Sequence, residues 1–143
     1  MKTTARNVLS GIVDAVTPGP VTTQVLVTVP GGHQVAATMT TAAAERLKLS
    51  AGNEALVLIK SSAVVLVLDF AGYALSARNQ FPGTISRVER GAVSSLIGLT
   101  LPGGTILTAS VTNDAVDALA LAVGMEATAV FKAYSVMVAV AAQ

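Results

Sequence analysis

The feature that most constrains the fold of this chain is an internal repeat. The stretch Thr4-Ala5-Arg6-Asn7 returns 72 positions later as Ser76-Ala77-Arg78-Asn79. In the same register, without a gap, Pro30-Gly31-Gly32 aligns with Pro102-Gly103-Gly104, and about twenty residues are identical over roughly 65 positions. The matched Gly and Pro residues mark backbone positions with restricted or unusual dihedral angles. The chain therefore consists of two tandem copies of one structural unit.

The hydrophobic pattern within each copy predicts mainly strands. Apolar residues at every second position indicate a half-buried strand, and they are Val21, Val25, Val27 and Val29 in the first copy and Val93, Ile97, Leu99 and Leu101 in the second. The Pro-Gly-Gly sequence that follows predicts a hairpin turn, because adjacent glycines accept the positive φ that tight turns need. Another strand follows each turn, so that the order in each copy is strand, strand, strand, helix, strand, strand.

A short helix is predicted over 41–49 and again over 113–121, because each stretch begins at residues that can cap free N–H groups and is rich in Ala and Leu. Two buried strands then follow in each copy, at 55–60 and 63–68 and at 127–132 and 135–140. Five strands with one helix between the third and fourth is the order of a small OB-type Greek-key barrel.

We therefore predict an all-β protein, with one short helix per repeat, made of two tandem OB-like five-stranded barrels. The expected domains are residues 1–68 and 76–143, and the short linker 69–75 should hold the barrels side by side with little freedom.

Composition bears on the oligomeric state of the protein and on its location in the cell. Hydrophobic residues make up 52% of the chain and charged residues 12%, which is more apolar surface than two small cores hide easily, so we expect a homo-oligomer. Mean hydropathy is +0.68, yet charged and small polar residues interrupt the apolar runs before the roughly 20 residues of a spanning helix. No membrane association is expected. The start of the chain lacks the apolar core of a secretory signal, so a cytoplasmic location is expected.

Other function classes fit this composition poorly. The net charge is +1, tryptophan is absent and Phe and Tyr are few, whereas an OB-fold module for single-stranded nucleic acid needs a basic groove and stacking aromatics. Nucleic-acid binding is therefore the weaker alternative.

An enzyme is not expected, because the chain has one histidine, no cysteine and no suitably spaced acid pair. His33, at the hairpin tip, is predicted to be an exposed turn residue, and no site for a bare metal cation is expected.

Hydrogen-bond donors do recur in register. The pairs are Thr4 and Ser76, Arg6 and Arg78, Asn7 and Asn79, and Lys60 and Lys132. A tetrahedral dianion has only acceptor oxygens and is therefore bound by Arg, Lys, hydroxyls and backbone N–H groups. One Arg and one Lys would match a charge of minus two. The alternative is structural: each Arg could pair with a carboxylate or hold a strand edge.

These residues resemble the molbindins, small molybdate- and tungstate-binding proteins built from the Mop (or TOBE) domain, in their tandem di-Mop form. The resemblance covers nearly the whole chain and rests on four motifs: the S/T-A-R-N start, the G-x-V turns Gly19-Pro20-Val21 and Gly91-Ala92-Val93, the Gly-Gly hairpin, and the strands ending in Lys60 and Lys132.

The resemblance implies a trimer of two-domain subunits that holds molybdate or tungstate at subunit interfaces. It also implies a role in molybdenum storage or homeostasis, without catalysis and without an organic cofactor. A first class of oxyanion site would use Thr4, Arg6, Lys60 and Ser61 in one copy and Ser76, Arg78 and Lys132 in the other. A second class, near the threefold axis, would use Gly19, Val21 and Thr22, and Gly91, Val93 and Ser94.

Two departures from the family pattern bear on these sites. Lys60 is followed by Ser61 and Ser62, whereas Lys132 is followed by Ala133 and Tyr134, so the two copies are expected to bind unequally. Thr22 and Ser94 stand where related sequences often carry Asn. Mop-like domains also serve as regulatory modules of transporters or transcription factors, but the chain has no P-loop or helix-turn-helix segment, which favours a stand-alone binding protein.

Overall fold

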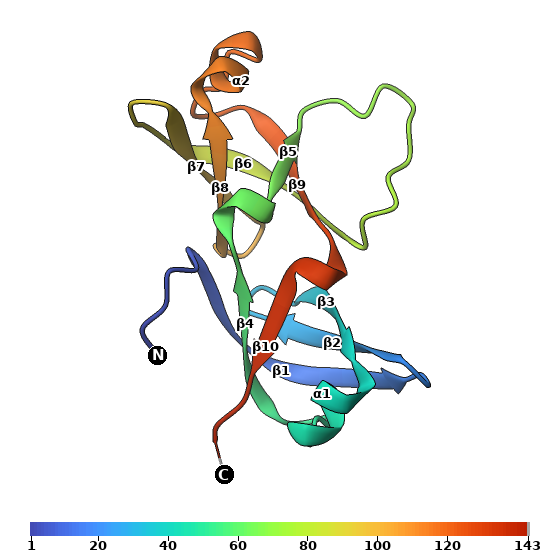
Figure 1. Cartoon of the computed structure of the whole chain (residues 1–143). Helices are drawn as coiled ribbons and strands as arrows, with labels where there is room; N and C mark the ends of the chain where they lie inside the picture. The colour runs from blue at the N-terminus through green and yellow to red at the C-terminus, as the bar shows by residue number, and fades with distance from the viewer. Residues whose placement is uncertain (143) are drawn as a thin grey trace.

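The computed structural model describes residues 1–142 and has the predicted order of elements in both repeats (Figure 1). The first repeat contains β1 (Asn7–Pro18), β2 (Thr22–Val29), β3 (His33–Thr40), α1 (Thr41–Arg46), β4 (Glu54–Ile59), the 3-10 turn η1 (Ser61–Ala63) and β5 (Val65–Val67). The second contains β6 (Asn79–Arg90), β7 (Ser94–Thr100), β8 (Ile106–Thr112), α2 (Asn113–Ala118), β9 (Glu126–Phe131), the 3-10 turn η2 (Ala133–Ser135) and β10 (Val136–Ala139). The all-β fold class with one short helix per repeat is confirmed. Within residues 1–142, no helix is long and apolar enough to cross a membrane.

The two repeats exchange their last strands. One antiparallel sheet has the order β10-β4-β1-β2-β3, and the other has the order β5-β9-β6-β7-β8. Val136 of β10 pairs with Ile59 of β4, and Val65 of β5 pairs with Val130 of β9. Figure 1 shows β10 running from the second repeat down into the sheet of the first, while β5 runs the opposite way.

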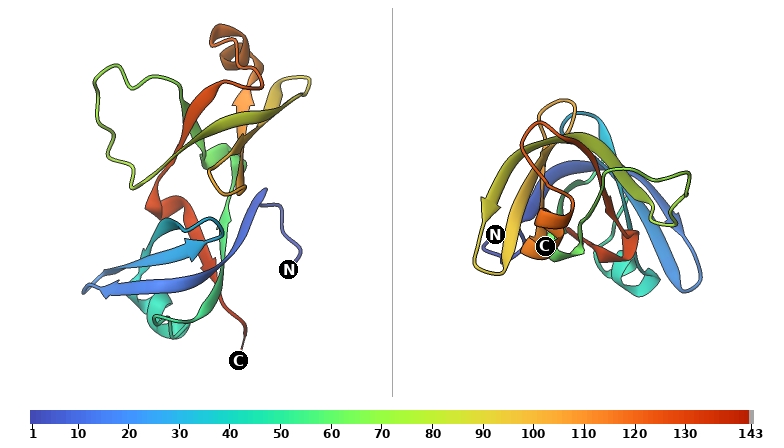
Figure 2. Two further views of the ribbon diagram at one scale, coloured as in Figure 1. Left: turned by 180° about the vertical axis from the view of Figure 1, so that it is seen from behind. Right: turned by 90° about the horizontal axis from the view of Figure 1, so that it is seen from above.

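The exchange means that the sheets do not follow the domain division expected from the sequence. Residues 1–68 and 76–143 each correspond to one repeat of the sequence, but each folded sheet takes one strand from the other repeat. Exchange, more than the linker 69–75, therefore holds the two sheets together. Each sheet is strongly curled (Figure 2), and its two edge strands approach each other, β10 toward β3 and β5 toward β8.

The alternating strand pattern buries one face of each sheet. In β2, Val25, Val27 and Val29 are buried, as the sequence predicts. Val21 and Val93 do not belong to this pattern: their exposed fractions are 74% and 75%, and they lie before the strands begin. Val21 and Val93 are still part of the turns that precede β2 and β7. The prediction that they belong to the buried side of these strands was therefore wrong. The buried side chains of both repeats form one continuous cluster.

Each helix begins as predicted and ends earlier. The Thr40 hydroxyl accepts a hydrogen bond from Ala43 N (3.2 Å), and Thr112 does the same for Ala115 N (3.3 Å). The helices end at Arg46 and Ala118, not near positions 49 and 121, because the residues that follow leave the right-handed region: Lys48 has φ 53° and Ala120 φ 50°. A left-handed residue closes the last turn and cannot continue a helix.

A repeated asparagine joins each repeat to the other. Asn79 accepts from the backbone N–H of Ala36 (2.8 Å) and donates to the Ala36 carbonyl (2.9 Å). Asn7 makes the same pair of bonds to Thr108, at 2.7 and 2.8 Å. Both asparagines are buried. Their recurrence in the sequence therefore reflects docking of one repeat on the other.

The two Pro-Gly-Gly hairpin tips also meet. A ring nitrogen of His33, Nε2, lies 2.7 Å from the Pro102 carbonyl oxygen, and the Thr105 hydroxyl donates to the Pro30 carbonyl (2.6 Å). The His33 ring is partly buried and lies edge-on to Phe81, with centroids 6.0 Å apart. The prediction that His33 is an exposed turn residue was wrong, because the second hairpin covers it.

The contact between the hairpins predicts unequal effects of two adjacent glycine substitutions. Gly103 and Gly104 both have positive φ (93° and 101°), but a Cβ on Gly103 would lie 2.9 Å from the Gly31 Cα, whereas a Cβ on Gly104 meets nothing within 4 Å. Both alanine variants should be strained, and Gly103→Ala should lower the free energy of unfolding by about 1–3 kcal/mol more than Gly104→Ala. Urea denaturation measures the difference. Equal losses would show that the tips do not pack as described.

The asparagine bonds predict a large loss on truncation. Asn79→Ala removes both partners of the buried Ala36 backbone groups and should lower the free energy of unfolding by about 2–5 kcal/mol. Gln80→Ala is the control, because Gln80 is exposed and bonds only within the preceding loop, to Leu75 and Ala77 carbonyls. Similar unfolding free energies for the two variants would contradict the docking role of Asn79.

Candidate functional site

The β-register brings each predicted Arg and Lys together. Asn7 of β1 pairs with Ile59 of β4, so the next residues outward, Arg6 and Lys60, lie side by side at the ends of adjacent strands. In the second repeat, Asn79 pairs with Phe131, which places Arg78 beside Lys132 in the same way. The cations of each pair are far apart in sequence and become neighbours only through antiparallel pairing.

These cations point away from the core. Asn7 and Ile59 are buried, and successive side chains of a strand alternate between faces. Arg6 and Lys60 therefore lie on the outer face, in agreement with their exposed side chains, and the same holds for Arg78 and Lys132. The arrangement leaves four cationic side chains open to a ligand.

No carboxylate neutralises these cations within residues 1–142. The ion pairs of this part of the chain join Arg87 to Glu89 and Arg90 to Asp117. The alternative that the repeated Arg residues serve to pair with carboxylates is therefore not supported. The described residues also contain no group of three or more His, Cys, Asp or Glu side chains that could hold a metal cation.

The predicted hydroxyls lie close to the cations along the chain. Thr4 and Ser76 are exposed, two residues before Arg6 and Arg78 respectively. Ser61 is partly exposed and opens the turn η1 directly after Lys60. The matching residue in the second repeat, Ala133, is buried and has no hydroxyl.

The second predicted class of site lies at the other end of β1 and β6. The turn that contains Gly19, Val21 and Thr22 joins β1 to β2 and packs against the start of α1. The Thr41 hydroxyl donates to the Gly19 carbonyl (2.7 Å), and Thr41 N donates to the Val21 carbonyl (2.9 Å). Since β1 has twelve residues, roughly 35 Å of strand separates this turn from Arg6. Within one chain the two classes of site are separate.

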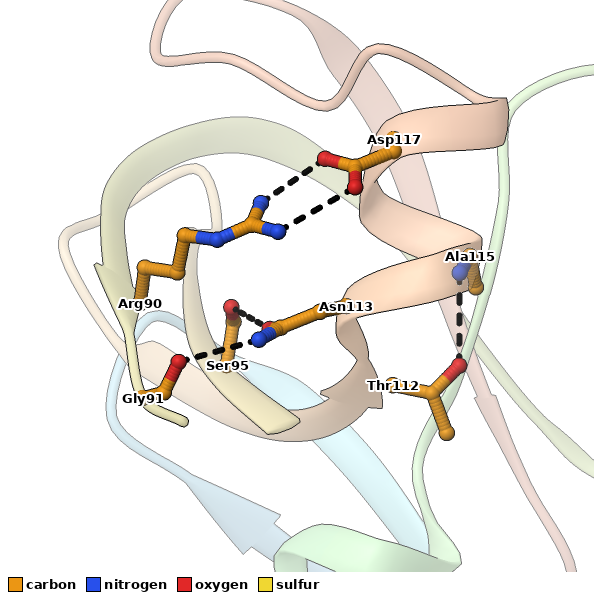
Figure 3. A network of polar contacts seen from close by, with 7 residues as sticks. All are labelled: Arg90, Gly91, Ser95, Thr112, Asn113, Ala115 and Asp117. Carbon is orange, nitrogen blue, oxygen red and sulfur yellow. Dashed lines mark hydrogen bonds and ion pairs between the residues drawn. The ribbon is translucent and has the colours of Figure 1, made fainter. Parts of the chain in front are cut away.

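The corresponding turn of the second repeat contains Gly91, Val93 and Ser94 and is held by a different pair of side chains (Figure 3). The Asn113 amide donates to the Gly91 carbonyl (2.9 Å), and the Ser95 hydroxyl donates to the Asn113 amide oxygen (2.6 Å). Thr23 and Thr41 take these two places in the first repeat, 2.9 Å apart. Sequence reasoning missed these supports, although a polar residue recurring in register at an inward strand position is a signal for them.

One ion pair beside this turn exists only in the second repeat. Arg90 bonds both carboxylate oxygens of Asp117, at 2.7 and 3.1 Å, whereas the matching residues of the first repeat are Pro18 and Glu45. The hydrogen bond from Arg90 lowers the pKa of Asp117, and the same bond raises the pKa of Arg90. Arg90 is thus already paired next to Gly91 (Figure 3).

Comparison with known proteins gives the same repeat. The model of the TOBE domain matches residues 3–66 and 75–138. The chain belongs to the TOBE domain family. Its two domains stand in tandem, and the two matched segments agree with the repeat found in the sequence.

Several relatives carry names that refer to molybdenum. The chain is 70% identical over 140 residues to the molybdenum transport protein ModE of Herbaspirillum seropedicae, covering 98% of this chain and 52% of that protein. It is 37% identical over 139 residues to the molybdenum-pterin-binding protein MopA of Rhodobacter capsulatus, covering 97% of this chain and 52% of that protein. The chain thus spans about half the length of these relatives.

One solved structure matches the whole chain. The cytoplasmic molybdate-binding protein ModG, in a crystal form with molybdate bound, superposes with a TM-score of 0.94 at 42% identity, covering 99% of this chain and 100% of ModG. The tandem arrangement inferred from the resemblance to molbindins is confirmed by this match and by the two TOBE domains.

The ion pair of this TOBE protein predicts a measurable titration. NMR should find the pKa of Asp117 below the ordinary value of an aspartate, and Arg90→Gln should raise it toward that value, because the hydrogen bond from Arg90 is the main cause of the shift. A lowered pKa in the folded state favours folding above the pKa of the unfolded state, and that benefit is lost as the pH falls through the folded value.

Proposed function

We propose that this chain binds molybdate or tungstate at sites built on the pairs Arg6–Lys60 and Arg78–Lys132. The ions would be held at subunit interfaces of a cytoplasmic homotrimer that serves molybdenum storage or homeostasis. The observation that carries the proposal is the register of the two sheets, which sets an exposed Arg beside an exposed Lys twice, with no carboxylate partner among residues 1–142.

Electrostatics favours a ligand between these side chains. Like charges directly opposite each other on neighbouring strands destabilise a sheet, so a bare Arg–Lys pair carries an energetic cost. A dianion placed between Arg6 and Lys60 removes that cost and matches their total charge. Guanidinium offers planar, bidentate donation to oxygen, and the ammonium adds a compact charge.

Hydroxyls complete the donor set. Thr4 and Ser61 lie near the first pair, and Ser76 lies near the second. If a charge-assisted hydrogen bond contributes about 1.5–3 kcal/mol net, four or five such bonds reach the roughly 8 kcal/mol of micromolar binding. The site is therefore adequate for a tetrahedral oxyanion without any metal ligand from the protein.

Two features support completion of these sites by a neighbouring subunit. The cations lie on an open face, and two surface grooves among the described residues, of about 790 and 800 Å³, are lined by other residues. Apolar side chains continue the same face beside the first pair: Val8 and Met137 flank Leu58 in the register, with exposed fractions of 40% and 55%. Contact with another copy would bury them and exclude water from the anion.

The relatives support the choice of ligand. ModG is described with molybdate bound, and MopA is named for binding molybdenum-pterin. We extend the ligand of ModG to this chain because the match covers all of ModG and because the chain supplies the donors that such an anion needs. The proposed role is binding rather than catalysis, and molybdate or tungstate is the ligand without an organic cofactor.

A regulatory module is the second candidate. Several relatives are named ModE, and those of Yersinia pestis and Escherichia coli are named as transcriptional regulators. In that case the anion would act through a partner or an attached DNA-binding segment, since this chain offers no basic surface field of its own. A stoichiometric protein partner on purification, or a shift of promoter DNA that depends on molybdate, would favour this candidate.

Calorimetric titration with molybdate, tungstate and sulfate, together with native mass, tests the proposal directly. We expect micromolar or tighter binding of molybdate and tungstate by a trimer, and no heat from sulfate. Absence of heat from all three anions would make the four cations structural residues.

Removing both Arg residues separates ligand binding from assembly. Arg6→Ala with Arg78→Ala should weaken molybdate binding at least 100-fold, because each site loses one or two charge-assisted bonds, about 3 kcal/mol. The trimer should persist. Arg46→Ala with Arg87→Ala is the matched control: it removes the same charge from exposed positions away from the strand ends and should leave affinity within about twofold. Loss of the trimer with unchanged affinity would assign Arg6 and Arg78 a structural role.

A further inference from the structure

We infer that Ser135 is a further ligand of the Arg6–Lys60 site, brought there from the other repeat by strand exchange, and that the Arg78–Lys132 site lacks this ligand because Ala63 occupies the matching position. The inference rests on the proposed function, since it assigns one more donor to the same anion. It also decides which of the two sites binds more tightly.

The register places Ser135 beside Lys60. β4 lies between β1 and β10, with Ile59 paired to Asn7 on one side and to Val136 on the other. One residue beyond these pairs, Lys60 has Arg6 on one side and Ser135 on the other. Three residues, each one position beyond the end of its strand, thus form one row at this edge of the sheet, although Ser135, the last residue of η2, belongs to the second repeat.

The row is open to solvent. Ile59 and Asn7 are buried, with exposed fractions of 0% and 2%, so Lys60 and Arg6, the next residues beyond them in extended backbone, lie on the opposite face. Val136, which starts β10 directly after Ser135, is also buried, with an exposed fraction of 4%. Lys60 is exposed, and Ser135 is partly exposed. The Ser135 side chain is therefore accessible at the strand end where the two cations lie.

The Ser135 hydroxyl is free to donate. Its backbone N–H bonds the Lys132 carbonyl (3.0 Å), which closes the turn η2, but its side chain makes no hydrogen bond to any of the described residues. A hydroxyl held on an ordered turn beside two cations is suited to an anion, because it can rotate its proton toward an acceptor oxygen at little cost.

The matching row of the second repeat has no hydroxyl at this place. Val65 pairs with Val130, so two residues further, beyond the paired ends of the strands, Ala63 at the end of η1 lies beside Lys132, with Arg78 on the other side. A second difference lies in the residue after each lysine, which is Ser61 in the first repeat and Ala133 in the second. The Arg6–Lys60 site thus has two hydroxyls where the Arg78–Lys132 site has two methyl groups, and we expect it to bind the anion more tightly.

The experiment isolates one site at a time in the full chain and titrates it with sodium molybdate by calorimetry. Arg78→Ala leaves the Arg6–Lys60 site, and in that background Ser135→Ala should weaken binding about tenfold, the value of one net hydrogen bond of about 1.4 kcal/mol. Arg6→Ala leaves the Arg78–Lys132 site, and there Ala63→Ser should strengthen binding by a similar factor. Ser135→Ala should have no effect in the Arg6→Ala background.

Two further variants test whether the effect is specific to the hydroxyl of Ser135. Ser10→Ala removes a hydroxyl from the same outer face, but the register places Ser10 beside Leu56, away from the cations, so affinity should stay unchanged. Ser135→Thr keeps the hydroxyl and should retain most of the affinity. Native mass and circular dichroism of each variant should match those of the wild-type protein.

The outcomes separate this inference from the proposed function. No molybdate binding by the wild-type protein would overturn the proposed function itself. Binding by the wild-type protein that responds to Arg6→Ala and Arg78→Ala, but not to Ser135→Ala or Ala63→Ser, would overturn only the assignment of Ser135. Equal weakening by Ser135→Ala in both backgrounds would show a structural effect and would also overturn it.

Discussion

Each repeat completes its five-stranded sheet with a strand from the other repeat, and the rest of the structure depends on this exchange. The segment between β4 and β5 contains only the turn η1 and one residue on each side of it, so the chain continues across to the second sheet instead of folding back. Val136 and Ile59, paired across the exchange, are both buried. A unit of about 65 residues is close to the lower limit for an independent core, and sharing strands gives both units one continuous core.

The same exchange determines what surrounds the cations. β4 and β9 become inner strands, with a neighbour on each side, only because β10 and β5 arrive from the other repeat. Lys60 and Lys132 at the ends of these strands therefore have neighbours from both repeats. The asparagine bonds and the meeting of the hairpin tips fix the relative position of the two sheets, so that the strand ends form a defined surface. The proposed anion site needs this rigidity, because its donors lie at the ends of three different strands.

The two copies have diverged in the polar residues around otherwise equal backbones. The turn after β6 is held by Ser95 and Asn113, whereas Thr23 and Thr41 hold the equivalent turn after β1. An ion pair beside the second turn has no counterpart beside the first. The apolar outer face formed by Val8 and Met137 in one sheet is replaced by Gln80 and Val65 in the other. Duplication thus preserved the fold while the chemistry at each end of the molecule changed.

The sequence by itself determined the repeat, the order of the strands and helices, the turn at each Pro-Gly-Gly and the cationic residues that recur, because these follow from local patterns of side chains. It did not determine the length of the helices, which depends on left-handed backbone at Lys48 and Ala120, residues without a strong preference for it. The roles of Asn7, Asn79 and His33 were also invisible, since their partners lie in the other repeat. Only the tertiary structure decided which sheet each fifth strand joins, because the same apolar strand could pair at the edge of either sheet. The outcome depends on the path of the five-residue connection between β4 and β5 and on the core that both repeats share.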